Sequence, residues 1–180
     1  MAQAAVTHGE LEQLKAALLL GDDDIVALRQ AHDILGPRVE ELLEVWYGFV
    51  GSHDFLLEYF STSDGPNTDY LDAVRTRFGQ WVFDLTSGNY DDAWRAQQEE
   101  IGRRHYQEKG HTDGVDGTPD VVHLRYIVAL VYPIFATVRP FLEQGESDPE
   151  AVERMHQAWL KAVLLSVALW SHPYVHEEAF

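Results

Sequence analysis

Apolar residues recur at every third or fourth position along most of this chain, and this spacing constrains the fold more than any other feature of the sequence. The clearest example lies between residues 68 and 87, where one helical face would carry Leu71, Val74, Phe78, Trp81, Val82 and Leu85. This period is typical of amphipathic helices, whereas a half-buried strand alternates at every second residue. No run of four to eight residues alternates in that way between turn residues. The pattern therefore predicts an all-α protein.

Turn and capping residues divide the pattern into separate helical segments. We expect these at residues 9–20, 22–35, 37–51, 52–60, 68–87, 90–108, 118–142 and 148–170. Thr118-Pro119-Asp120 offers an N-cap, a first-turn proline and an acid, which together favour a helix start. Because the middle of that segment is nearly all apolar, we expect a long central helix, bent at Pro133.

Length and composition suit one globular domain that covers residues 1–180. A chain of 180 residues with 46% apolar side chains can bury roughly 70% of its unfolded surface. No uninterrupted apolar run approaches the roughly 20 residues of a membrane span. The N-terminal stretch MAQAAVTHGELEQL lacks the basic and apolar parts of a secretory signal. We therefore expect a cytoplasmic protein without a membrane span.

The absence of cysteine and the strong negative charge exclude several functional classes. Without cysteine the chain forms no disulfide, thiolate zinc site, iron–sulfur cluster or thioether-linked haem. A bound metal must then be held by histidine, carboxylate, tyrosine or methionine. The formal net charge of −17 repels phosphate backbones, so nucleic acids and anionic membranes are poor candidate partners.

Most of the nine histidines are interpreted as ordinary surface or core residues. Pro173 interrupts the helix that would align His172 and His176 as ligands. Glu153 and His156 form the half-motif of a di-iron helical bundle, but such a site needs two of these motifs and two further carboxylates. The chain has only one Glu-x-x-His, which argues against a di-iron site.

His105 differs because its helix is otherwise polar. It lies on the same helical face as Trp94 and Ile101, so the imidazole should face the core. Gly102, one turn earlier, would leave an open surface beside the ring on which something flat could lie. Spacing alone leaves two interpretations, of which it favours the first: a core histidine bonded to a carbonyl, or a ligand for an iron cofactor.

Aromatic and aliphatic residues in other segments could complete a pocket. Trp46 and Tyr47 place two large rings in adjacent positions, and a buried tyrosine needs a partner for its hydroxyl. Phe78 adds a third ring, while Leu130 and Ile134 lie on the inner side of the expected central helix. An apolar pocket with one imidazole and one phenol suits a haem with a small axial ligand. Alternatively, these side chains simply pack together.

Four arginines flank Phe78 and His105 in the sequence, namely Arg75, Arg77, Arg103 and Arg104. They could pair with the charged edge of a dianionic cofactor, and Arg77, which directly precedes Phe78, is our candidate for that role. Solvated helix faces carry arginines as well, so this signal adds only modest support.

Several stretches, in order and at compatible spacing, resemble the protoglobins, single-domain haem proteins related to the sensor domains of globin-coupled sensors. The most specific are VWYGFVGS, YLDAVRTRFGQWV, NYDDAW, IGRRH followed by TDGVDGTPD, and LRYIVALVYPIFATVRPFL. The likeness spans nearly the whole chain. It implies a globin-like helical sandwich with an additional N-terminal helix.

The same resemblance implies a site for haem b (iron protoporphyrin IX). His105 would be the proximal iron ligand, Trp46 and Tyr47 the distal pair, and Phe78 would face the ligand side, with Leu130 and Ile134 lining the pocket. The family has Phe at the position of Leu130, and the smaller side chain could widen access. Protoglobins bind dioxygen, carbon monoxide and nitric oxide, and they typically pair through their last two long helices. The resemblance therefore implies a gas-binding homodimer.

Two sequence features predict how such a haem would bind its ligands. The segment 68–87 contains no histidine, so the iron should be pentacoordinate in the ferrous state. Tyr47 would donate a hydrogen bond to dioxygen, which is worth about 1 kcal/mol or about five-fold in affinity. Three alternatives remain open: a haem enzyme acting on nitric oxide, peroxide or carbene donors; a gas sensor that signals through a separate partner; and a haem-free helical interaction module.

Overall fold

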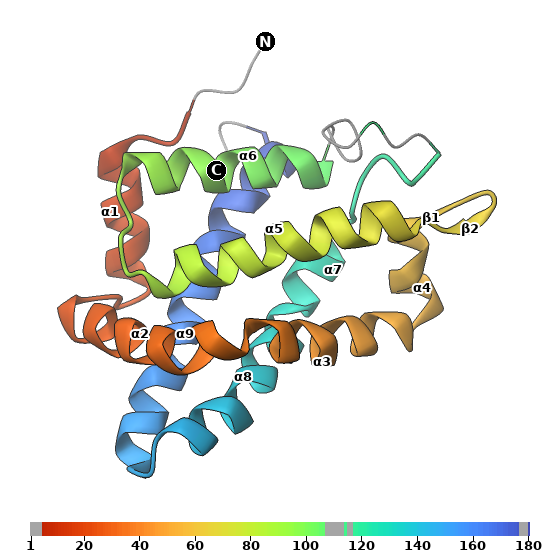
Figure 1. Ribbon diagram of the computed structural model, residues 1–180. Coiled ribbons are helices and arrows are strands. Elements are labelled where there is room, and N and C mark those ends of the chain that lie inside the picture. Colours follow the sequence, from red (N-terminus) through yellow and green to blue (C-terminus); the bar gives the residue numbers. More distant parts are fainter. Residues whose placement is uncertain (1–4, 107–113, 115–116, 177–179) are drawn as a thin grey trace.

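Helices account for most of the chain in the computed structural model, which describes residues 5–106, 114, 117–176 and 180 (Figure 1). The α-helices are α1 (His8–Ala17), α2 (Asp22–Leu35), α3 (Val39–Gly51), α4 (Asp54–Leu57), α5 (Thr68–Thr86), α6 (Asp92–Tyr106), α7 (Leu124–Ala129), α8 (Val131–Gly145) and α9 (Pro149–Ser171). Short 3₁₀ helices occur at η1 (Gly36–Arg38), η2 (Glu58–Phe60) and η4 (His172–Tyr174). The strands β1 (Ser61–Thr62) and β2 (Gly65–Pro66) form a small antiparallel hairpin. The all-α prediction is confirmed.

Local capping explains why several helices begin close to their predicted positions. At α1, the Thr7 hydroxyl accepts from the backbone N–H of Glu10 at 3.2 Å, and the Glu10 carboxylate accepts from the Thr7 N–H at 2.7 Å. At α9, Asp148 accepts from the N–H of Glu150, and Pro149 occupies the first turn. These contacts satisfy N–H groups that have no partner inside the helix.

The predicted start of the long helix at Thr118 is wrong. Residues 118–123 are not helical, and α7 begins at Leu124. The backbone of Val122 is engaged in tertiary contacts instead, because its N–H donates to the His105 carbonyl at 2.7 Å and its carbonyl accepts from the Tyr174 hydroxyl at 2.6 Å. These bonds hold Val122 beside the end of α6 and leave the segment outside any helix.

The bend expected at Pro133 is a break that lies three residues earlier. Leu130 ends α7 and precedes α8, so the predicted single helix is two. Pro133 has no N–H to donate to the Ala129 carbonyl, and its ring clashes with that carbonyl. The helix therefore breaks next to Ala129, the residue whose carbonyl lacks its donor.

The last two residues of the predicted segment 90–108, and His111, lie outside the described residues.

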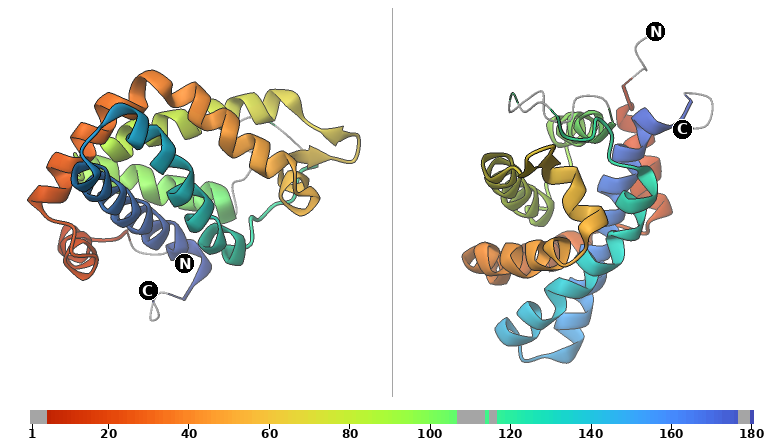
Figure 2. Two further views of the ribbon diagram at one scale, coloured as in Figure 1. Left: turned by 90° about the horizontal axis from the view of Figure 1, so that it is seen from below. Right: turned by 90° about the vertical axis from the view of Figure 1, so that its right-hand side faces the viewer.

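Helix α9 occupies the centre of the molecule. It packs against α1, α2, α5, α6, α7 and α8. The side view in Figure 2 shows α3, α5 and α6 on one side and α7, α8 and α9 on the other. Trp159 of α9 is fully buried, and its indole N–H donates to the Ile134 carbonyl at 3.3 Å. This bond joins α9 to α8 within the core.

Residues Leu124–Gly145, which cover α7 and α8, make the one helical stretch of the described chain that is long and apolar enough for a membrane span. Core helices of globular proteins pass the same test. This stretch packs against α2, α3 and α9. It also contains Arg139, which pairs with Glu143 at 2.9 Å and with Glu153 at 2.8 Å.

Helix α6 is held mainly from one side, by α9 and η4. At the middle of α6, the buried carboxylate of Glu99 accepts from the backbone N–H of Val6 at 2.7 Å and from Arg95 at 3.1 Å. His172 of η4 lies 3.7 Å from the same carboxylate, and the Arg95 guanidinium donates to the Val6 carbonyl. Segments from both ends of the described chain are thus fastened to α6.

Candidate functional site

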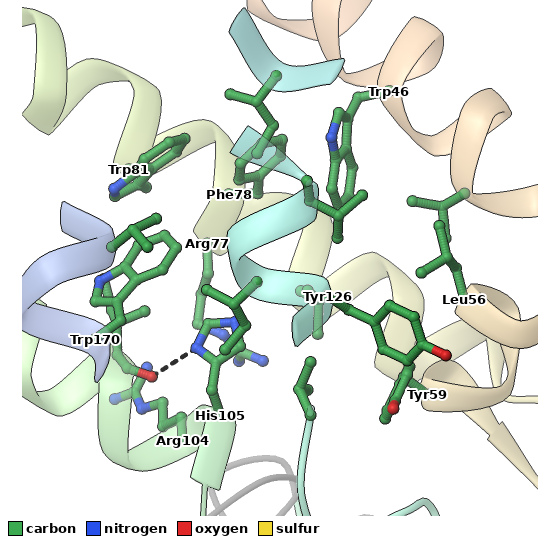
Figure 3. A pocket seen from close by; sticks show the side chains of 18 of the residues that line it. Trp46, Leu56, Tyr59, Arg77, Phe78, Trp81, Arg104, His105, Tyr126 and Trp170 are labelled. Carbon is green, nitrogen blue, oxygen red and sulfur yellow. Dashed lines mark hydrogen bonds between the residues drawn. The ribbon is translucent and has the colours of Figure 1, made fainter. Parts of the chain in front are cut away.

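A cavity of about 330 Å³ lies between α3, α5, α6, α7, α8 and α9, and Figure 3 shows side chains that line it. This volume falls in the range of small-molecule and cofactor sites. Most lining side chains are aromatic or aliphatic, among them Trp46, Leu56, Phe78, Trp81, Ile101, Tyr126, Ile127, Val163 and Trp170. The polar and charged side chains are Arg77, Gln80, Gln97, Glu100, Arg104 and His105, all on α5 and α6. The cavity is therefore apolar with one polar side.

The fold brings all seven residues singled out from the sequence to this cavity. They are Trp46 and Tyr47 of α3, Arg77 and Phe78 of α5, His105 of α6, Leu130 at the α7–α8 break, and Ile134 of α8. The Phe78 ring lies 4.7 Å from that of Trp46 and stacks on Trp81 at 5.2 Å, between centroids. Segments that are distant in the sequence thus contribute to one site.

His105 faces the cavity from the last turn of α6 (Figure 3). Its Nδ1 lies 2.8 Å from the carbonyl oxygen of Ile101. Because a carbonyl oxygen only accepts hydrogen bonds, this contact assigns the proton to Nδ1 in the neutral ring. Nε2 then carries the lone pair, and this is the tautomer that a metal-ligating histidine requires. His105 thus has the carbonyl contact expected of a core histidine, and it also lines the cavity as an iron ligand would.

Two buried hydrogen-bond donors on α3 find no acceptor among the described residues. These are the indole N–H of Trp46 and the hydroxyl of Tyr47. Leaving such a group unpaired costs about 1–3 kcal/mol. Burial also raises the pKa of the Tyr47 phenol, so the hydroxyl keeps its proton at neutral pH. A cofactor with a polar diatomic ligand would give these donors an acceptor, so the residues present fit a haem site.

Gly102 does not leave an open surface, contrary to the expectation from the sequence. A Cβ atom at this position would lie 2.9 Å from the Cα atom and 3.1 Å from the carbonyl oxygen of Trp170. The glycine instead allows the backbones of α6 and α9 to approach closely. The flat group beside His105 is the Trp170 indole itself, stacked on the imidazole at 5.2 Å between centroids and 21° between planes.

The structure brings only two of the four flanking arginines to the cavity. Arg77 and Arg104 line it, and Arg104 donates to Glu100 at 3.1 Å. Arg103 also pairs with Glu100, at 2.6 Å, and these hydrogen bonds, the one from Arg103 above all, lower the pKa of the Glu100 carboxyl. Arg75 pairs instead with Glu40 of α3 at 3.1 Å.

Sequence reasoning assigned no place in the site to several cavity residues, among them Tyr59, Tyr126 and Trp170. Trp170 lies at the end of the expected segment 148–170, where the spacing of apolar residues does not distinguish a cavity wall from the core. Tyr59 forms a hydrogen bond with His123, which lies 64 positions away in the sequence. A separation of this length leaves no local pattern from which the contact could be inferred.

Comparisons with known proteins agree on one fold. A family model described as Protoglobin matches residues 7–179. The globin domain of the globin-coupled sensor of Geobacter sulfurreducens superposes with a TM-score of 0.71 at 17% sequence identity, covering 92% of this chain and 97% of that domain. No curated protein matches the chain at a significant level. The predicted globin-like sandwich is confirmed, with α1 as the additional N-terminal helix.

Proposed function

Because this chain belongs to the protoglobin family, we propose that it is a haem b protein that reversibly binds dioxygen, carbon monoxide and nitric oxide at a pentacoordinate iron. One observation carries the proposal. A single histidine, His105, faces a largely apolar cavity in which two buried donors, on Trp46 and Tyr47, lack a partner among the described residues. This combination matches what a haem with a small axial ligand requires.

His105 is proposed to hold the iron through Nε2, while its Nδ1–H donates to the Ile101 carbonyl. Bound haem b supplies a ferrous iron with an open sixth position for a diatomic ligand. Phe78, Leu130 and Ile134 line the cavity with apolar side chains and are proposed to pack against the bound group. Arg77 and Arg104 are the arginines among the residues that line the cavity, and they are proposed to pair with the two propionates.

Tyr47 is proposed to favour polar ligands over carbon monoxide. Its hydroxyl is protonated at neutral pH and has no acceptor among the described residues, so a hydrogen bond to a ligand breaks no existing bond within the protein. The gain is therefore larger than for a donor that must first leave a partner. The Trp46 indole N–H is a second unpaired donor on the same helix.

The visible spectrum of the haem-loaded protein tests the proposal. We expect a Soret band that changes between the ferric, ferrous and carbonyl forms, and loss of the ferrous five-coordinate spectrum in His105→Ala. His8→Ala, at an exposed position on α1, is the control. An unchanged Soret band and unchanged carbon monoxide binding in His105→Ala would show that the ligand assignment is wrong. A protein that takes up no haem would favour the haem-free interaction module.

We also propose that the protein is a cytoplasmic homodimer that pairs through α8 and α9. Two large side chains next to the break between α7 and α8 are exposed, Tyr132 of α8 at 73% and Val128 of α7 at 56%. The pairing mode follows the family resemblance, and these two side chains offer apolar surface on which the partner would pack. Light scattering after size-exclusion chromatography should give a dimer for the wild type and a monomer for Tyr132→Glu. A monomeric wild type at micromolar concentration would refute the pairing.

A further inference from the structure

We propose that Gln98 is a positioning residue that fixes the orientation of His105 through the indole of Trp170. The inference rests on the proposed role of His105 as the iron ligand. Gln98 is completely buried on α6, and its Oε1 accepts a hydrogen bond from the indole N–H of Trp170 at 3.0 Å. The same indole stacks on the His105 ring at 5.2 Å between centroids. One side chain of α9 therefore connects two residues of α6.

The connection follows from the way α6 meets α9. Gln98, Gly102 and His105 share one face of the helix because they are spaced by four and three residues. The missing Cβ of Gly102 lets the Trp170 backbone approach α6 between the other two. The indole then extends along α6, and Figure 3 shows it beside His105. Its N–H contacts Gln98, and its ring contacts His105.

The hydrogen bond determines which way the indole lies. An indole that rotated away from Gln98 would lose the acceptor that the structure gives its buried N–H, and this loss is unfavourable. The indole plane is therefore held, and it restricts one face of the His105 imidazole. The Ile101 carbonyl restricts the same ring from the edge, at Nδ1. Together the two contacts limit rotation of the ring about its Cβ–Cγ bond.

The chemistry of Gln98 argues for a positioning role over simple packing. Its Nε2 is buried and has no acceptor among the described residues. A buried amide with an unpaired donor is less stable than an apolar side chain of the same shape. Packing alone would favour methionine or leucine at this position. Unlike methionine or leucine, Gln98 has an amide oxygen that accepts a hydrogen bond from the Trp170 indole, which lies against the proposed iron ligand.

Four single variants of the haem-loaded protein test the inference. Gln98→Met removes the acceptor, whereas Gln98→Glu keeps an oxygen acceptor. Trp170→Phe keeps an aromatic ring against His105 but removes the N–H. Ser166→Ala is the control. Ser166 accepts from the indole N–H of Trp81 at 3.3 Å, and among the described residues the Trp81 ring contacts Trp170, at 5.4 Å between centroids, but not His105. The substitution therefore removes an indole acceptor one ring further from the proposed iron ligand. The readout is the iron–histidine stretching band in the resonance Raman spectrum of the ferrous protein.

We expect the band to shift or broaden in Gln98→Met and in Trp170→Phe, and to keep its wild-type position in Gln98→Glu and Ser166→Ala. Because Gln98 acts through Trp170, the double variant Gln98→Met/Trp170→Phe should shift the band no further than the single variants. Loss of this single hydrogen bond should change carbon monoxide affinity by at most about five-fold. Hydrogen exchange of the Trp170 indole N–H in the cofactor-free protein should accelerate in Gln98→Met.

The outcomes separate this inference from the proposed function. An unchanged band in both Gln98→Met and Trp170→Phe overturns the inference alone, since haem ligation by His105 would remain. If Gln98→Met does not fold, Trp170→Phe and Gln98→Glu decide the question. An equal shift in Ser166→Ala would assign the effect to general loosening of the core and would overturn the positioning role. A wild-type protein without an iron–histidine band overturns the ligand assignment, and the inference with it.

Discussion

The backbones of α6 and α9 meet at Gly102 and Trp170, where a Cβ atom on Gly102 would lie 2.9 Å from the Trp170 Cα atom. Backbone atoms cannot move aside as the end of a flexible side chain can, so a substitution here must separate the two helices. The contact lies one turn before His105, and it therefore sets the distance between the proposed iron-binding helix and the core.

Gly102→Ala should lower the free energy of unfolding by about 1–3 kcal/mol, because the added methyl group forces α6 away from α9. Gly48→Ala is the control. Gly48 lies in α3, and a Cβ there would have no neighbour within 4 Å, so alanine should stabilise the protein by up to about 1 kcal/mol. Urea denaturation of the cofactor-free proteins measures both changes. Equal effects of the two substitutions would contradict the close approach.

Tyr47→Phe should have opposite effects on stability and on gas binding. Without cofactor it removes a buried hydroxyl that has no partner among the described residues, so the free energy of unfolding should rise by about 1 kcal/mol. With haem bound it removes a donor, so dioxygen affinity should fall about five-fold while carbon monoxide affinity changes less. Stopped-flow ligand dissociation and urea denaturation provide the two measurements.

Tyr90→Phe is the matched control for that experiment. The Tyr90 hydroxyl is also buried, but it donates to the Leu85 carbonyl at 2.6 Å. Its removal should therefore destabilise the protein by about 1 kcal/mol and leave gas affinity unchanged. If Tyr47→Phe instead destabilised the cofactor-free protein as Tyr90→Phe does, the Tyr47 hydroxyl would already have a partner.

Glu99→Ala should destabilise the protein by about 3 kcal/mol, because it leaves the largely buried guanidinium of Arg95 without its closest carboxylate. It also removes the acceptor of the Val6 N–H, so limited proteolysis should cut the segment before α1 sooner. Glu12→Ala, which breaks the more exposed pair with Lys15, should change the free energy of unfolding by less than about 1 kcal/mol. Similar losses in both variants would argue against a structural role for the Glu99 contacts.

The stability of the protein should depend on pH through His156. Burial lowers the pKa of His156 below its ordinary value of 6.5, and in the folded state Nε2 donates to the Phe135 carbonyl at 2.8 Å. Arg139 donates to Nδ1 at 3.2 Å, which also opposes protonation. Below about pH 6.5 the unfolded chain binds the proton more readily than the folded protein, so the free energy of unfolding falls as the pH falls.

His156→Gln should remove this contribution. Between pH 7.5 and 5 the melting temperature of the wild type should fall more steeply than that of the variant, whereas above pH 7 the two curves should run parallel. His8→Gln replaces an imidazole at the exposed start of α1 and serves as the comparison. Parallel curves for wild type and His156→Gln over the whole range would refute the assignment.

Much of the fold could be predicted because the signals are local. The apolar stripe of residues 68–87 repeats at every third or fourth position, and the proline and acid at the start of α9 lie within one turn. The start of α7 could not be predicted in this way. Thr118-Pro119 has the chemistry of a helix start, but the backbone of Val122 bonds to His105 and Tyr174, and the segment is not helical. Tertiary bonds outweighed the local signal.

In the candidate site, too, local signals could be predicted from the sequence and tertiary contacts could not. The residue types and the family resemblance selected seven side chains, and all of them line the cavity. Gly102 was misinterpreted, because a missing Cβ marks either an open surface or a close helix crossing and the sequence does not distinguish the two. The contact between Gln98 and Trp170 joins residues 72 positions apart, so it became visible only once α6 and α9 were placed together.

The one-sided packing of α6 has a consequence for how a cofactor would enter and leave. α6 packs mainly against α9 and η4, and its inner residues line the cavity. The contacts of α2 and α8 with α9 do not involve α6. A local opening of α6 therefore exposes the cavity and leaves the rest of the core assembled, at a free-energy cost below that of global unfolding. Transfer of haem to an acceptor protein should then proceed at the rate of this local opening. The rate constant of haem transfer should therefore depend less on denaturant concentration than the rate constant of global unfolding does.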